Sequence, residues 1–234
     1  MLLFNLGLLG ENPLFFVYLV IATSVALLVA ITFHEFSHAL MAKRLGDDTA
    51  ERAGRVSLNP LAHLDPLGTA MLFLVGFGWG KPVPVNPLSM RSDPKVGMAL
   101  VAASGAAANL VVAGAVALPI RLGVLSWHSP FALSLSSFLS LEGTLTTVIG
   151  FIVLYNLLLA LFNLIPIPPL DGFNIALGLL PRALAHSFSQ IAPYGPVVLM
   201  LVIGLGYFTG VNILWYALDP AISFLSLLLV GRAL

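Results

Sequence analysis

The sequence predicts an all-α polytopic membrane protein with about four to six transmembrane helices and one re-entrant or extended segment. Hydrophobic residues make up 59% of the 234 residues, charged residues only 9%, and the mean hydropathy is +1.02. Soluble proteins usually carry about 25% charged residues, so a soluble globular enzyme is excluded. The ten basic and ten acidic residues balance, and no stretch is densely basic, which excludes a nucleic-acid partner.

The composition also limits the chemistry. The chain contains no cysteine, so disulfides, thiolate catalysis and thiolate metal sites are excluded. Any metal ion must therefore be held by histidine, aspartate or glutamate. Because no long polar linker, low-complexity tract or repeat divides the sequence, we expect a single domain over residues 1–234.

Four long runs without a charged residue or histidine approach or exceed the roughly 20 residues that a transmembrane helix needs. They cover residues 12–33, 96–120, 143–170 and 187–218. The first helix is expected to continue to about Gly46, because residues 33–45 contain neither proline nor glycine. The last run allows one long or two short spans, since Pro193, Pro196, Gly210 and Pro220 permit several divisions.

The distribution of basic residues predicts the orientation. Seven of the ten lie between the first span and Val96: Lys43, Arg44, Arg52, Arg55, Lys81, Arg91 and Lys95. This side is therefore expected to be cytoplasmic. The apolar run Pro66–Gly80 is too short to cross, and basic residues flank it on both sides, so it should enter the membrane and return.

The first span carries an HExxH motif, His34-Glu35-Phe36-Ser37-His38. On a helix the two imidazoles lie four residues apart on one face, where they can bind one metal ion, and Glu35 is available for proton transfer. Lys43 marks the cytoplasmic interface, so His34 and His38 lie about 14 and 8 Å below it. The alternative is that these side chains only tie helices together, although buried ionisable groups are costly without a function.

Hydrolytic zinc sites usually have three protein ligands and one water, so a third ligand is needed at a similar depth. Asp171 is the candidate, because it follows a proline-rich stretch from Asn163 to Leu170 that should break the helix beside a cavity. Capping of the helix that follows is the alternative role for Asp171. His63 is expected on the surface at the cytoplasmic interface, outside the site.

These residues resemble the site-2 protease family of intramembrane zinc metalloproteases, in its short form without a PDZ or CBS domain. The resemblance covers about residues 25–175. It rests on the HExxH motif and on the family's N-x-x-P-x-x-x-L-D-G motif, present here from Asn163 to Gly172. It also includes a polar loop, Gly78–Pro87. In the middle helix, Ser104 to Asn109 departs from the family pattern because Ala106 replaces a proline, so no kink is implied there.

The resemblance implies one zinc ion bound by His34, His38 and Asp171, with Glu35 as the catalytic base. It implies transmembrane protein substrates, and a multi-pass protein in a prokaryotic cell membrane with its site near the cytoplasmic side. Asn163 would stabilise the oxyanion or hold substrate backbone, with an interhelical hydrogen bond as the alternative.

Two further asparagines are weaker candidates. Asn86 and the extended stretch Lys81–Pro87 would bind an unwound substrate by strand addition, or form a plain interfacial turn. Asn109 would join the polar cavity, or hold neighbouring helices together by hydrogen bonds.

Two other classes of function compete with the protease. A metal transporter or channel would use the same four ionisable residues as a transit site. A non-catalytic scaffold would hold zinc in a closed, four-ligand site. Without a soluble regulatory domain, the selectivity of a protease would reside in the lipid bilayer or in a regulatory membrane partner.

Overall fold

The computed structural model describes residues 10–75, 78–127, 129–130, 139–210 and 213–232. The α-helices in this part are α2 (Pro13–Arg44), α3 (Thr49–Arg52), α4 (Pro66–Val75), α5 (Pro94–Arg121), α7 (Leu141–Asn163), α8 (Asp171–Leu179), α9 (Arg182–Ser189), α10 (Gly195–Thr209) and α11 (Ile213–Val230). Three 3-10 turns accompany them: η2 (Pro60–Ala62), η3 (Pro87–Ser89) and η4 (Ala192–Tyr194). These residues contain no named strand, only an isolated bridge. The all-α prediction is confirmed.

Five helices among the described residues are long and apolar enough to cross a membrane. They are α2, α5, α7, the stretch Arg182–Gly206 that joins α9 to α10, and α11. The C-terminal region thus supplies two spans, which divide at Gly210, whose φ of 72° ends α10. Pro220, considered above as a dividing point, instead lies inside α11.

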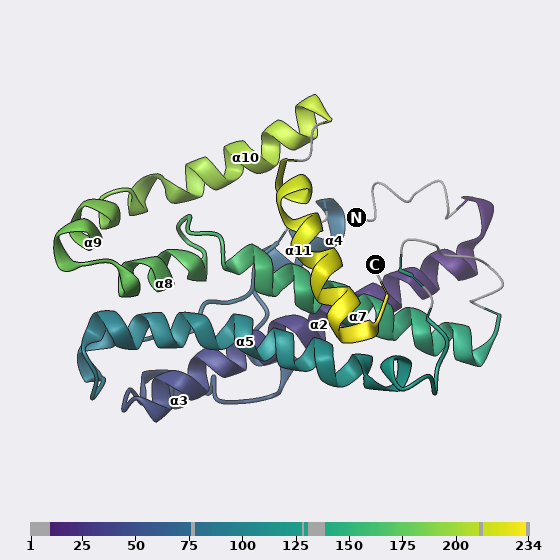
Figure 1. Cartoon of the computed structure of the whole chain (residues 1–234), viewed down its shortest axis with the longest axis horizontal. Coiled ribbons are helices and arrows are strands. Elements are labelled where there is room, and N and C mark those ends of the chain that lie inside the picture. Colours follow the sequence, from purple (N-terminus) through teal and green to yellow (C-terminus); the bar gives the residue numbers. More distant parts are fainter. Residues whose placement is uncertain (1–9, 76–77, 128, 131–138, 211–212, 233–234) are drawn as a thin grey trace.

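The centre of the fold is a three-helix group in which α2, α5 and α7 pack against one another (Figure 1). Small residues dominate these contacts: Ala26, Ala39, Ala102, Ala106, Ala113 and Ala160 are all almost completely buried. Small side chains allow helix backbones to approach closely, which is how helices associate without a hydrophobic driving force from water. Helix α8 packs on α5, and α11 packs on α5 and α7.

The ends of the first helix follow the sequence closely. The Asn12 side chain accepts a hydrogen bond from the amide of Phe15, and Pro13 occupies the first helical position, where its missing N–H costs nothing. The helix ends at Arg44, and Gly46 follows with a φ of 103°, which confirms the predicted stop. Helix α5 runs without interruption through Ala106, as its sequence predicts.

The short apolar run has the path expected of a re-entrant segment. Helix α4 lies within it, and its two flanks meet: Leu64 pairs with Gly80, and the amide of Lys81 donates to the carbonyl of His63 at 2.8 Å. The chain therefore enters and leaves the apolar run at adjacent positions. His63 is fully buried beneath this contact, so its predicted surface position is wrong. Its Nε2 lies 2.7 Å from the carbonyl of Ser57, whereas its Nδ1 is buried without a partner among the described residues.

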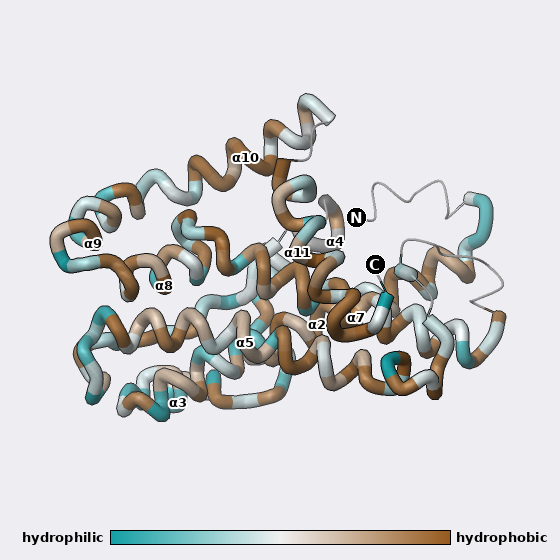
Figure 2. The backbone as a smooth tube through the Cα atoms, viewed as in Figure 1, coloured by the Kyte–Doolittle hydropathy of each residue, from teal (hydrophilic) through white to brown (hydrophobic). Residues whose placement is uncertain are grey.

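One end of the molecule is markedly more polar than the rest. Figure 2 shows hydrophilic residues around α3 and at the start of α5, and mainly hydrophobic residues along the middle of the long helices. The last turn of α2 carries Lys43 and Arg44 at the same end.

Candidate metal site and cavity

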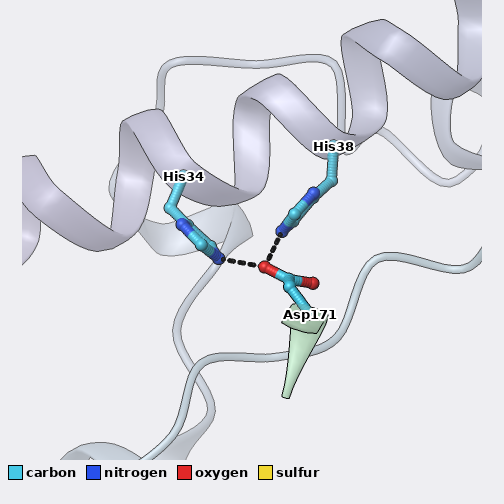
Figure 3. A group of neighbouring side chains, drawn as sticks. All are labelled: His34, His38 and Asp171. Carbon is cyan, nitrogen blue, oxygen red and sulfur yellow. Dashed lines mark ion pairs between the residues drawn. The ribbon is translucent and has the colours of Figure 1, made fainter. Parts of the chain in front are cut away.

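His34 and His38 project from one face of α2 toward Asp171, the first residue of α8 (Figure 3). Their ring centroids lie 4.5 Å apart, and the residues are only 4% and 8% exposed. The Asp171 Oδ2 atom lies 3.1 Å from the Nε2 atom of His34 and 3.2 Å from that of His38. Among the described residues, these three form the group whose atoms converge closely enough to hold a metal ion.

Asp171 does not act as a helix cap. Helix α8 begins at Asp171 itself, and the residue at its N-cap position is Leu170, whose side chain makes no capping hydrogen bond. Gly172 explains the tight turn that places this carboxylate: a Cβ there would lie 2.5 Å from the carbonyl oxygen of Ile165. The start of α8 can therefore lie directly on the chain that follows α7, which brings the two histidines and the aspartate together across 133 residues of sequence.

The hydrogen bonds of the imidazoles determine which nitrogen is free. His34 Nδ1 lies 2.7 Å from Asn109 Oδ1, and His38 Nδ1 lies 2.7 Å from the carbonyl oxygen of Val101. Both partners are acceptors, so each Nδ1 carries the proton and, in a neutral ring, each Nε2 presents a lone pair. Two lone pairs and one carboxylate oxygen thus face one another, an arrangement that calls for a cation between them. Within the described parts of the chain, Asp171 Oδ2 is buried without a hydrogen-bond donor, so these residues fit a bound metal ion.

Asn109 is fully buried and connects three helices. Besides contacting His34, its amide nitrogen donates to the carbonyl of Ala30 at 3.0 Å and to Asn156 Oδ1 at 2.7 Å. Asn156 in turn donates to the carbonyl of Ile152 at 2.8 Å. These bonds orient the Asn109 oxygen toward His34. Asn109 therefore ties the helices together and contacts His34, but it is not among the residues that line the cavity.

Gly105 is the position where α5 approaches the two imidazoles most closely. A Cβ there would lie 2.5 Å from His38 Cε1 and 2.7 Å from His34 Cε1, distances that real Cβ atoms do not show. Glycine is therefore required for α5 to lie against the rings. Nothing in the local sequence Ser104 to Asn109 marks Gly105 for this role.

A cavity of about 570 Å³ opens beside the three candidate ligands. Glu35 and Asn163 line it, together with Trp79, Gly80 and mainly aliphatic residues of α2, α5 and α7. Asn163 donates its amide N–H to the carbonyl of Leu159 at 3.0 Å, one turn earlier on α7. The predicted neighbours His34, Glu35, His38, Asn163 and Asp171 are thus brought to one cavity.

Asn86 occupies a different position. Its side-chain oxygen accepts from the amide of Leu88 at 3.2 Å and caps the 3-10 turn η3. Its backbone amide donates to Asp47 Oδ2 at 2.6 Å. The structure therefore uses Asn86 to end the extended stretch, and does not place its side chain on the cavity wall.

Arg55 was not selected from the sequence, yet it lies beside Glu35. The guanidinium is buried, and Nη2 lies 3.9 Å from Glu35 Oε2. Burial lowers the pKa of Arg55, while the Glu35 carboxylate raises it. Gly80 faces Glu35 from the other side: a Cβ there would lie 3.3 Å from Glu35 Oε1. No pattern in the sequence links Arg55 to the motif, because twenty residues separate it from Glu35.

Comparison with known proteins identifies the family of this chain. The sequence model of peptidase family M50 matches residues 22–203. A Bacillus subtilis protein named "Putative zinc metalloprotease YwhC" is 36% identical over 178 residues, which are 76% of this chain and 78% of that protein. No solved structure matches significantly.

Two mycobacterial proteins named Rip2, with the same description as YwhC, are also similar. The Mycolicibacterium smegmatis protein is 33% identical, covering 70% of this chain and 59% of the relative. The Mycobacterium tuberculosis H37Rv protein is 28% identical, covering 87% of this chain and 77% of the relative. With a family match over most of its length and an HExxH motif on one of five candidate spans, the chain belongs to peptidase family M50, the site-2 protease family.

Proposed function

We propose that this protein is an intramembrane zinc metalloprotease that hydrolyses peptide bonds in or near the transmembrane segments of other membrane proteins. The observation that carries the proposal is the convergence of His34 Nε2, His38 Nε2 and Asp171 Oδ2 beside a cavity that Glu35 also lines. The family membership and the names of the relatives support zinc as the metal.

The three candidate ligands suit a hydrolytic zinc site. Two neutral imidazoles and one carboxylate are a common ligand set for catalytic zinc, and three protein ligands leave a position for water. When bound, the metal lowers the pKa of a water molecule to about 7 and polarises a carbonyl group. The scaffold alternative needs a fourth protein ligand, and the described residues place three in this group.

Glu35 is the proposed general base and acid. Its carboxylate is 16% exposed and lines the cavity, so it can accept a proton at one oxygen and later donate it to the leaving amine. The nearest guanidinium nitrogen, at 3.9 Å, attracts the carboxylate without forming a hydrogen bond to it. The lone pairs of Glu35 therefore stay available for the proton transfer.

The substrate is proposed to be a locally unwound transmembrane segment. A helix shields its own carbonyl groups, so the backbone must open before the cavity can receive it. The extended stretch Lys81–Pro87 would pair with that backbone by strand addition, and Asn163 would stabilise the oxyanion or hold substrate backbone. The mainly aliphatic cavity wall suits apolar side chains on both sides of the cleaved bond. Substrate selection would come from the lipid bilayer or from a regulatory membrane partner.

The membrane orientation is part of the proposal. The basic residues at the end of α2, in the connector and at the start of α5 predict that the metal site lies near the cytoplasmic side of a prokaryotic cell membrane. The five apolar spans support an integral membrane protein.

The direct test compares the parent protein with Glu35→Gln in detergent, using a transmembrane substrate that contains a helix-breaking residue. We expect equal zinc content in the two proteins and cleavage by the parent only, because glutamine cannot accept the proton. Glu51→Gln, in which an exposed glutamate of α3 outside the cavity loses its charge, is the matched control and should stay active. A fully active Glu35→Gln variant would refute the assignment of the base.

The same experiment separates the proposal from its competitors. If the parent and Glu35→Gln both bind zinc and neither cleaves the substrate, the result would contradict the protease proposal and favour a metal-binding role. Metal flux into vesicles would then distinguish a transporter from a scaffold.

A further inference from the structure

Arg55 forms three contacts that join the connector after α2 to the candidate active site. Its Nη1 donates to the carbonyl of Pro82 at 3.0 Å, and its Nη2 donates to the carbonyl of Lys81. The same Nη2 atom lies 3.9 Å from Glu35 Oε2. Arg55 is only 3% exposed, so these contacts form away from bulk water and are weakly screened.

Burial of an arginine is costly and indicates a specific requirement. The desolvation of a buried charge amounts to several kcal/mol, and well-packed apolar residues often stabilise a fold equally well. Arg55 Nε lacks a partner within the described part of the chain, so the side chain is not fully satisfied. The benefit must therefore lie in the geometry that the guanidinium imposes on its other partners.

The contacted carbonyls belong to the extended stretch that borders the cavity. Val83 and Val85 line the cavity next to Gly80. This stretch is also held at its start by the bond from the Lys81 amide to the His63 carbonyl and at its end by the bond from the Asn86 amide to Asp47. Pro82 and Pro84 lack an N–H group, so the stretch can donate few backbone hydrogen bonds. It therefore depends on the side chains of Arg55 and Asp47.

We propose that Arg55 is a positioning residue that holds the extended stretch Lys81–Pro87 and the Glu35 carboxylate in one fixed relation across the cavity. This inference rests on the proposed protease function, in which the stretch binds substrate backbone and Glu35 transfers the proton. A substrate bond held by the stretch would then be presented to Glu35 at a constant distance. A displacement of about 1 Å between two such groups can cost about 100-fold in rate.

Lysine should not replace arginine in this role. A planar guanidinium directs several N–H groups in fixed directions, so it can contact two successive carbonyls and face a carboxylate at once. A lysine ammonium is a single point of charge on a flexible chain. Arg55→Lys therefore keeps the charge but loses the fixed relation, whereas Arg55→Met removes both.

The first measurement does not depend on catalysis. The chain has no cysteine, so Val83→Cys introduces a single reporter on the extended stretch. We expect a water-soluble maleimide to label this cysteine several-fold faster when Arg55 is lysine or methionine than when it is arginine, because the stretch is released. Arg52→Met is the matched control: Arg52 lies on the same connector, but its side chain is 82% exposed and contacts Asp48.

The second measurement uses cleavage by the full-length enzyme with Val83 intact, normalised to bound zinc. We expect Arg55→Met to lower kcat/KM by about 100-fold, with a rise in KM as well as a fall in kcat, and Arg55→Lys to recover only part of the loss. A residue needed only for folding would lower the zinc-loaded fraction and leave KM unchanged. Arg52→Met should match the parent.

The outcomes distinguish this inference from the proposed function. If the parent cleaves no substrate, the protease proposal fails, and the labelling rates still decide whether Arg55 holds the stretch. Unchanged labelling in both variants, or an unchanged KM at normal zinc content, would overturn the role of Arg55. If Arg55→Met does not fold, the comparison is made with Arg55→Lys, which keeps the buried charge paired.

Discussion

Two regions of the molecule present the functional side chains in different ways. In the helical core, His34 and His38 are held by hydrogen bonds to Asn109 Oδ1 and to the carbonyl of Val101, with helix α5 pressed against the rings at Gly105. In the connector between α2 and α5, the extended stretch is held at its two ends by the buried charges of Arg55 and Asp47. The core relies on close packing and neutral hydrogen bonds, and the connector relies on charge.

This difference predicts different consequences of mutation. Changes in the core should affect metal binding first, because the ligands have no freedom to adjust. Changes in the connector should leave the metal in place and alter activity or the response to pH. The following substitutions test this division, beginning with the largest expected effect.

Gly105→Ala should have the largest effect in the core. The new Cβ would lie 2.5 to 2.7 Å from ring atoms of both histidines, so either the rings or helix α5 must move. We expect a loss of about 1–3 kcal/mol in stability, at least a tenfold fall in zinc affinity and no cleavage. Zinc content and melting temperature measure these effects.

Gly114→Ala provides the matched control on the same helix. A Cβ there contacts Leu229 Cδ2 at an ordinary 3.5 Å, so this variant should bind zinc normally and gain up to about 1 kcal/mol from helix propensity. Normal zinc binding by Gly105→Ala would show that the core adjusts more freely than its packing implies.

Asn109→Ala should have an intermediate effect, restricted to one of the two histidines. The substitution leaves the Nδ1 proton of His34 without its acceptor, whereas His38 keeps its bond to the Val101 carbonyl. Loss of such a partner typically weakens metal binding by 10–100-fold. Competition with a zinc chelator measures this affinity.

Asn156→Ala sharpens the same test. It removes one acceptor of the Asn109 amide, but the Ala30 carbonyl still holds that amide. We therefore expect zinc affinity to fall by less than about tenfold. An equal fall in zinc affinity in Asn109→Ala and Asn156→Ala would mean that Asn109 acts by general packing and not through His34.

Much of the candidate site could be predicted from the sequence because its spacing is local. A separation of four residues places two histidines on one face of any helix, and the proline-rich break marks Asp171 as a residue beside a cavity. The long apolar runs also predicted the transmembrane helices from local sequence, because the thickness of a bilayer sets a minimum length for each apolar run. Gly46 ends the first helix as expected.

The remaining features depend on contacts between distant segments. Arg55 and Glu35 meet only because the connector folds back beneath the re-entrant run, and His63 is buried by the same fold although its local sequence resembles a surface turn. The glycines at 105 and 172 are required by close approaches to other helices or loops. Such requirements cannot be read from local spacing, because they are set by tertiary packing.

Asp47→Asn should have the smallest effect on zinc binding, and its effect on stability should show a pH dependence that the core variants lack. Asp47 is buried; Oδ2 accepts the Asn86 amide at 2.6 Å, and Oδ1 accepts the Thr49 amide at 3.0 Å. Burial would raise the pKa of Asp47, but the hydrogen bonds from Thr49 and from the Asn86 amide hold it below its ordinary 3.8. Ionised Asp47 therefore stabilises the fold above that value, and the contribution is lost as the pH falls through the lower, folded-state pKa.

Thermal unfolding of metal-free protein in detergent measures this contribution. At neutral pH, Asp47→Asn should be less stable than the parent by about 1.5–3 kcal/mol, the usual value of hydrogen bonds to a charged group. The difference should shrink as the pH falls below about 4, because the parent then loses the same charge. Asp48→Asn, at an exposed neighbouring position, should cost less than about 0.5 kcal/mol at any pH. If Asp47→Asn is less stable than the parent by the same amount in acid, the connector is held by packing, as the core is. The two regions would then not differ in how they hold the functional side chains.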